Sequence, residues 1–130
     1  MILSTLLALA AAAQDPEIDC DNAMAQLEPN ACAYKEFERT DAAMNAQWKL
    51  TAARMKQIDK DFDRTQDNRP GYFDTLLAAQ RAWLTYRDQH CASEGYTMRG
   101  GSAEPMVISG CQTQLTDART KQLKELIEEY

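Results

Sequence analysis

The cysteines constrain the fold of this chain most, because an exported protein usually oxidises an even number of them to disulfides. The 130 residues contain four, Cys20, Cys32, Cys91 and Cys111. Four cysteines allow three pairings, and we favour Cys20–Cys32 with Cys91–Cys111 because each bond closes a short local loop. Each bond would stabilise the fold by roughly 3 kcal/mol. A zinc site is the alternative, but no Cys-x-x-Cys spacing occurs and His90 is the only histidine, so we expect no metal.

Residues 1–13 predict a secretory signal peptide. They carry no charged side chain, and their leucines give way to alanines, with a cleavage point after Ala13. The segment is shorter than the roughly 20 apolar residues of a membrane span, and no later segment is apolar enough. No Lys or Arg precedes the apolar run, so a frayed N-terminal helix is the alternative interpretation. We expect residues 14–130 to form one soluble domain in the periplasm or outside the cell.

The net charge of the chain limits the classes of partner that it could bind. The net charge is −6 and the basic residues form no continuous run, so repulsion from phosphate argues against a nucleic-acid partner. The same charge would attract a basic protein, and the alternative interpretation, favoured on charge alone, is that it only keeps the chain soluble. Gly95, Gly100 and Gly101 lack the Gly-Lys-Ser/Thr of a phosphate-binding loop, and we expect no cofactor.

Three amphipathic segments predict an all-α fold. The first begins at about Asn30, a suitable N-cap, and fades in the turn-rich stretch Thr65–Gly71. Its stripe, in steps of three and four, is Phe37, Asp41, Met44, Trp48, Thr51, Met55, Ile58 and Phe62. Such a helix would be about 50 Å long. We therefore expect either a break near Asp59–Asp61 or an end that projects beyond the other helices.

The second helix is predicted from about Tyr72 to Gly95, since glycine tolerates the left-handed conformation of a helix C-terminus. Its stripe is Phe73, Leu76, Leu77, Gln80, Trp83, Leu84, Arg87 and Cys91. After a loop at Tyr96–Gly101, Ser102 is expected to cap the third helix, with Pro105 in its first turn. The third stripe is Ile108, Cys111, Leu115, Ala118, Gln122, Leu126 and Tyr130, with Leu123 alongside.

These segments predict a small antiparallel bundle of three main helices, with an irregular N-terminal arm and two disulfides. Four polar side chains fall on or beside the apolar stripes, namely Asp41, Gln80, Arg87 and Arg119. An unpaired buried charge is costly, so we expect a partly buried network with Asp41 near Arg87 or Arg119. We interpret this network as structural, because no histidine or second carboxylate shares these positions; the alternative is that it lines a site.

Several segments resemble one known family. They are Asp41, Met44-Asn45, Ala79-Gln80-Arg81-Ala82-Trp83-Leu84-Thr85-Tyr86-Arg87-Asp88, Cys91, Gly100-Gly101-Ser102, Pro105-Met106, Cys111, Leu115-Thr116, Arg119 and Leu123. The chain resembles the LprI-type lysozyme inhibitor family, also known as a domain of unknown function found in bacterial envelope proteins. The resemblance covers roughly Cys20 to Leu126, and Gln-x-x-Trp-x-x-Tyr-Arg-x-x-x-Cys is its most specific part. It implies an exported helical domain with paired cysteines that inhibits lysozyme.

The chain departs from the lipoprotein members of that family, because Glu17-Ile18-Asp19 before Cys20 do not form a lipidation signal. Animal-type lysozymes are usually basic and cleave peptidoglycan with two carboxyl groups in a cleft. An acidic inhibitor would be steered towards them. The expected cleft-filling element is the loop tied by Cys91–Cys111, namely Tyr96, Thr97, Met98, Arg99, Gly100, Gly101 and Ser102. Arg99 would bind a catalytic carboxylate and Tyr96 would stack at a sugar site; the alternative is a simple turn followed by a helix cap.

Two other function classes compete with lysozyme inhibition. A periplasmic adaptor or envelope-stress protein without lysozyme contact would use an exposed helix face, around Lys49, Arg54, Lys56 and Asp63. An enzyme is disfavoured because the one histidine, His90, precedes a cysteine that is expected to be oxidised and so not nucleophilic.

Overall fold

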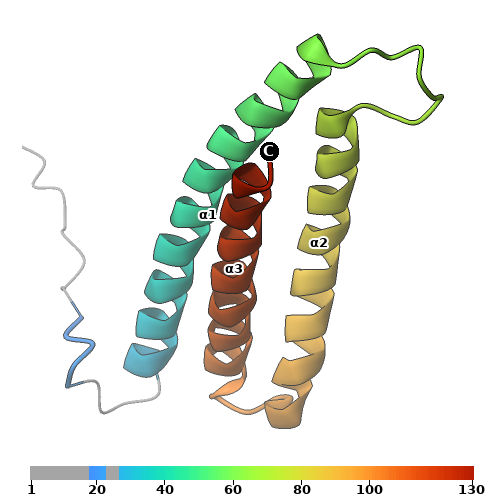
Figure 1. The fold of residues 1–130 in the computed structure, drawn as a ribbon. Helices are drawn as coiled ribbons and strands as arrows, with labels where there is room; N and C mark the ends of the chain where they lie inside the picture. The colour runs from blue at the N-terminus through green and yellow to red at the C-terminus, as the bar shows by residue number, and fades with distance from the viewer. Residues whose placement is uncertain (1–17, 23–26) are drawn as a thin grey trace, which may run out of the picture.

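The computed structural model describes residues 18–22 and 27–130, and it is a bundle of three helices (Figure 1). The helices are α1 (Leu27–Asp61), α2 (Tyr72–Gly95) and α3 (Glu104–Glu128), and a short 3-10 helix, η1 (Tyr96–Met98), follows α2. No strand occurs in these residues, which confirms the all-α prediction. The predicted signal peptide, residues 1–13, lies outside the described residues. In the described part of the chain, no helix combines the length and apolar character needed to cross a membrane.

Both disulfides are formed as predicted. Cys20 is bonded to Cys32 and Cys91 to Cys111, with Cα–Cα distances of 5.5 and 5.4 Å. The first bond ties the described part of the N-terminal arm to α1. The second joins α2 to α3 beside their connection, and both of its cysteines are buried.

The first helix projects beyond its partners, as one of the two expected outcomes. Its 35 residues span about 52 Å, against about 36 Å for α2. The C-terminal end of α1 extends past the end of α3 in Figure 1. The predicted N-cap at Asn30 is wrong, because α1 already includes Leu27 and Pro29 stands in its first turn, where no amide is needed. The Asn30 side chain instead donates to the Ser102 carbonyl at 2.8 Å.

The second helix begins at Tyr72, as predicted, and takes its cap from α1. Asp59 accepts hydrogen bonds from the backbone amides of Tyr72 and Phe73, at 2.7 and 3.0 Å. Gly71, the residue before the helix, offers no side chain for this purpose. A carboxylate more than ten residues earlier in the chain therefore satisfies the first amides of α2, which have no partner within their own helix.

Gly95 is the last residue of α2, but the prediction that it adopts a left-handed conformation there is wrong. Its φ is −59°, within the right-handed helical region, and the chain continues into η1. Gly95 is instead buried against Ile108 of α3, where a side chain would not fit. The glycine with left-handed backbone is Gly100, at φ 78°.

The third helix differs from its prediction in cap and in buried face. Ala103, not Ser102, precedes Glu104, and no side chain caps this end, although Pro105 does stand in the first turn. Three residues of the predicted stripe, Ala118, Gln122 and Tyr130, are exposed. The buried residues are Ser109, Cys111, Thr116 and Leu123. The small hydroxyl side chains therefore face the other helices.

The core combines a few apolar side chains with buried hydroxyls. Met44, Met55, Leu76 and Leu123 form the buried cluster, and both tryptophans pack against it while staying partly exposed. Thr51 of α1 donates to the Leu123 carbonyl of α3 at 2.9 Å. This bond ties α1 to the backbone of α3, so hydroxyls stabilise an interface that larger apolar side chains would hold apart.

Candidate functional site

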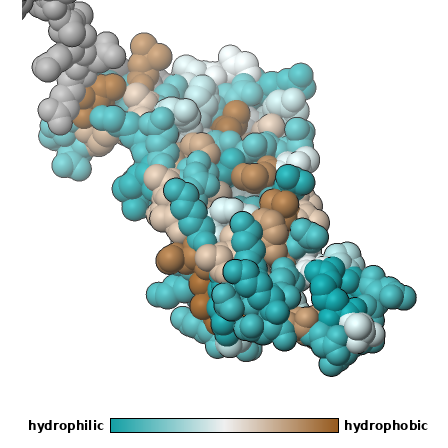
Figure 2. Space-filling view, turned by 90° about the horizontal axis from the view of Figure 1, so that it is seen from above, coloured by the Kyte–Doolittle hydropathy of each residue, from teal (hydrophilic) through white to brown (hydrophobic). Residues whose placement is uncertain are grey.

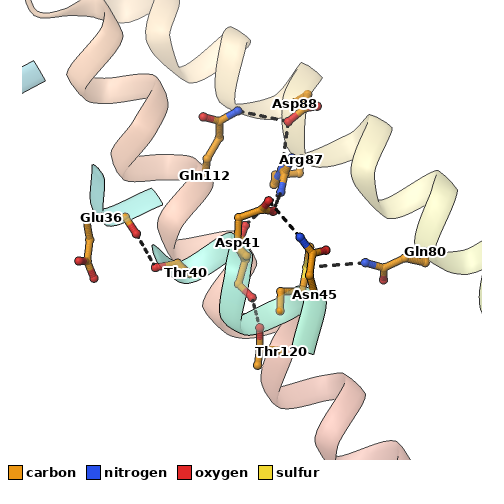
Figure 3. Close-up of polar contacts among 11 residues, drawn as sticks. Glu36, Thr40, Asp41, Asn45, Gln80, Arg87, Asp88, Gln112 and Thr120 are labelled. Atoms are coloured by element: carbon orange, nitrogen blue, oxygen red, sulfur yellow. Dashed lines mark hydrogen bonds and ion pairs between the residues drawn. The ribbon is translucent and has the colours of Figure 1, made fainter. Parts of the chain in front are cut away.

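Two groups of side chains stand out as candidate sites, and the first is the polar network between the helices (Figure 3). Arg87 of α2 donates from Nη1 to Oδ1 of Asp41 in α1 at 3.0 Å and to Oγ1 of Thr116 in α3 at 3.3 Å. Its Nε donates to Oδ1 of Asp88 at 3.0 Å. One buried guanidinium thus has partners on every helix of the bundle.

Aromatic rings and an amide complete the surroundings of Arg87. Its guanidinium carbon lies 5.0 Å from the ring centroid of Phe37 and 5.3 Å from that of Trp83, which suits a cation–π interaction. Gln112 of α3 donates to the same Asp88 oxygen at 3.2 Å. The charge of Arg87 is therefore balanced by two carboxylates, Asp41 and Asp88, that are themselves partly exposed to solvent.

The other two predicted network members pair with each other rather than with Asp41. Arg119 donates from Nε to Oε1 of Gln80 at 2.9 Å, and the Gln80 amide nitrogen contacts the sulfur of Met44 at 3.6 Å. Burial lowers the pKa of the Arg119 guanidinium. The structure thus holds two polar groups at different levels of the bundle, one around Arg87 and one around Arg119.

The second candidate is the connection between α2 and α3, residues 96–103, which we call the tip loop. Its backbone is well ordered by its own hydrogen bonds, from the Arg99 amide to the Tyr96 carbonyl (3.1 Å) and from the Gly101 amide to the Met98 carbonyl (2.8 Å). Gly100 has the left-handed backbone that favours glycine, and its amide donates to the Glu104 carboxylate at 2.8 Å. The loop therefore has a defined shape.

The side chains of the tip loop face solvent. Tyr96 is 54% exposed and Met98 is 45% exposed. The Arg99 guanidinium carbon lies 4.4 Å from the ring centroid of Tyr96, so the two side chains form one stacked unit. Of the predicted loop residues, Tyr96 and Arg99 are thus brought together, whereas Ser102 contributes its carbonyl to Asn30 rather than a helix cap.

The loop is anchored to all three helices. The Cys91–Cys111 disulfide joins α2 and α3 just behind it, and the Asn30–Ser102 hydrogen bond attaches it to the start of α1. These attachments leave the loop at one end of the bundle (Figure 1). A loop that is held by these contacts and carries exposed side chains can present them to a partner.

A metal-like grouping also occurs near the loop. Ligand atoms of His90, Glu94 and Cys111 lie within 4.8 Å of one another. The Cys111 sulfur is bonded to Cys91, so it is not the thiolate that zinc requires. His90 is exposed and stacks on Tyr86 at a centroid distance of 5.3 Å.

The helix face proposed for an adaptor is only partly free. Lys49, Lys56 and Asp63 are exposed. Arg54 instead donates to the backbone carbonyl of Tyr130 at 2.7 Å, and Lys56 lies over the Phe73 ring at 4.5 Å.

Comparison with known proteins places this architecture in a family. The family described as lysozyme inhibitor LprI matches residues 20–123, a span that includes both disulfides, the polar network and the tip loop. An uncharacterized protein of Rhizobium meliloti (strain 1021) is 43% identical over 128 residues, which cover 97% of this chain and 92% of that relative. No solved structure matches. The chain therefore belongs to the LprI lysozyme inhibitor family.

Proposed function

We propose that this protein binds a basic lysozyme outside the cytoplasm and blocks its active-site cleft with the tip loop. The observation that carries the proposal is the stacked Tyr96–Arg99 pair on an anchored, exposed loop. The family supports a protein partner and an inhibitory role rather than an enzymatic one.

The chemistry of the loop suits a cleft that holds carboxyl groups and sugars. The Arg99 guanidinium would hydrogen-bond a catalytic carboxylate, since arginine binds carboxylates with two parallel donors. Tyr96 would occupy a sugar subsite through its ring. Because the Cys91–Cys111 disulfide and the Asn30 contact already order the loop, little conformational entropy would be lost on binding.

Electrostatic attraction would assist the encounter. The chain carries a net charge of −6, whereas the proposed partner is basic. Opposite net charges raise the association rate, and added salt screens the attraction. Inhibition is thus expected to weaken as ionic strength rises, chiefly through slower association.

Export is part of the proposal. Two disulfides are typical of proteins that fold outside the reducing cytoplasm. The expected signal peptide at residues 1–13 would direct the chain there, and a soluble periplasmic or secreted form would meet an incoming lysozyme.

A turbidity assay tests the function directly. Lysis of bacterial cell walls by hen lysozyme is followed with the native protein, with an Arg99→Ala variant and with a matched Arg81→Ala variant. Arg81 is an exposed arginine on α2, away from the tip loop. The proposal expects the native protein and the Arg81 variant to inhibit equally, and the Arg99 variant to be at least about tenfold weaker. Equal potency of all three would remove the tip loop from the mechanism, and no inhibition by the native protein would contradict the function.

A further inference from the structure

A groove lies near the start of α2, among side chains of all three helices. Figure 1 shows that this end of the bundle is opposite the tip loop. Its volume is about 870 Å³, within the range of cavities that hold small organic ligands. The apolar side chains that line it come from all three helices and from the residues next to them, and include Met55, Phe62, Tyr72, Leu76, Leu126 and Tyr130. Figure 2, seen from above this end, shows apolar side chains at the surface among hydrophilic ones. We call this cavity the open-end groove.

Arg119 gives the open-end groove a cationic wall. Its guanidinium donates to the side-chain oxygens of Gln80 and Gln122, at 2.9 and 3.1 Å, and both acceptors are neutral amides. Among the ion pairs that the described residues form, none includes Arg119. Because arginine stays protonated at neutral pH, a partly buried positive charge faces the groove without a carboxylate to balance it.

The acids of the groove lie away from Arg119. Asp67 is paired with Arg69 at 2.7 Å, and Asp74 is exposed in the first turn of α2. Gln80, the partner of Arg119, lies further along α2 than Asp74 by about 9 Å. An anionic group is therefore favoured beside Arg119, whereas at the start of α2 the first amides and Arg69 already have carboxylate partners, Asp59 and Asp67.

We infer that the open-end groove binds a long-chain fatty carboxylate, with its head group on Arg119 and its alkyl chain along the partly exposed side chains of Tyr72, Leu126 and Tyr130. A carboxylate matches the forked donors of a guanidinium, and an alkyl chain would remove the apolar lining from water. From Arg119 to Tyr130, α3 runs for about 16 Å, which leaves room for an extended chain. The inference is independent of lysozyme inhibition, since the tip loop lies at the other end of the bundle.

Calorimetric titration of the full chain separates the two features of this ligand. Dodecanoate, kept below its micelle concentration, is expected to bind at one site. Hexanoate keeps the carboxylate but shortens the chain, and dodecyltrimethylammonium keeps the chain but inverts the charge. Both are expected to bind at least about tenfold more weakly. No binding of dodecanoate, or equal binding of the cationic analogue, would overturn the inference.

Paired variants locate the site. Ala79 lines the groove, whereas Ala82 is exposed on the same helix outside it. Ala79→Trp should abolish dodecanoate binding and Ala82→Trp should leave it unchanged. Arg119→Leu should weaken binding at least about tenfold, whereas Arg69→Leu, at the other lining arginine, should not. Unchanged binding in Ala79→Trp would place the ligand elsewhere, and lysis assays on that variant should show undiminished inhibition of lysozyme.

Discussion

A methyl group added at Gly95 would lie 2.5 Å from Cγ1 of Ile108, closer than two unbonded carbons approach. The absence of a side chain at this position lets α2 and α3 meet near the disulfide that joins them. We expect Gly95→Ala to lower the free energy of unfolding by about 1–3 kcal/mol through overpacking. The measurement is urea denaturation.

Gly110 supplies the matched control for Gly95. It lies inside α3 with nothing within 4 Å of an added Cβ, so Gly110→Ala should raise stability by about 0.5–1 kcal/mol. The cost of the double variant should be less than the sum of the costs of Gly95→Ala and Ile108→Ala, since removing the Ile108 side chain clears the clash. Equal effects of alanine at the two glycines would show that the close approach to Ile108 does not matter.

The cap that Asp59 provides predicts a second stability change. Asp59→Ala removes the acceptor of two amide hydrogen bonds at the start of α2, and should reduce the free energy of unfolding by about 1–2 kcal/mol. Asp61 is exposed and lies two residues after Asp59. The free energy of unfolding of Asp61→Ala should therefore stay within about 0.5 kcal/mol of that of the native protein. The two variants are compared by their denaturant midpoints. If Asp61→Ala lost as much stability as Asp59→Ala, the cap would not explain the loss.

The buried guanidinium of Arg87 predicts a structural cost without a functional one. Arg87→Met leaves Asp41 without its cation, but that carboxylate is partly exposed, so we expect a loss of about 2 kcal/mol. Arg39→Met, which removes an exposed pair with Glu36, should leave the denaturation midpoint unchanged. If a fully folded Arg87 variant lost lysozyme inhibition, the network would belong to a binding site.

The disulfide behind the tip loop predicts a coupling between stability and inhibition. The double substitution Cys91→Ala with Cys111→Ala should cost about 3 kcal/mol and weaken inhibition, because the loop must then be ordered on binding. Replacing Cys20 and Cys32 by alanine should leave inhibition intact, since that bond lies on the N-terminal arm. Equal inhibition by both double variants would show that the loop needs no such support.

The connection between α1 and α2 predicts a pH effect at Asp67. The Arg69 side chain and then its backbone amide hold the pKa of the Asp67 carboxyl below its ordinary value of 3.8. A lowered pKa in the folded state stabilises that state above the ordinary value and loses the effect as pH falls through the lowered pKa. Titration followed by NMR should place the Asp67 midpoint below 3.8, and Arg69→Gln should raise it. An unshifted midpoint in the native protein would contradict the ion pair.

The features that the sequence predicts correctly depend on residues that are close together along the chain. Helical spacing placed the start of α2 at Tyr72, and loop length selected the Cys91–Cys111 pairing, because both depend on neighbours along the chain. The caps were predicted less well. Asp59 satisfies amides of the next helix, and Asn30 reaches Ser102 across most of the chain, so neither partner is marked by a nearby sequence signal.

The buried face of α3 was misplaced for a different reason. The apolar side chain of Ala118 predicts that this residue is buried, but Ala118 is exposed and Thr116 is fully buried. The Thr116 hydroxyl accepts from Arg87, so a polar side chain is satisfied inside the bundle. The open-end groove had no sequence signal, because it results from helices of unequal length that end at different heights.

The unequal ends of the bundle also make the protein easy to attach without disturbing its tip loop. Asn68 is exposed in the polar connection between α1 and α2, and the uninterrupted length of α2 separates this connection from Arg99 by about 36 Å. A dye or a surface linker coupled to the thiol of an Asn68→Cys variant would leave Tyr96 and Arg99 pointing into solution. Immobilised molecules would then all present the same end to a lysozyme.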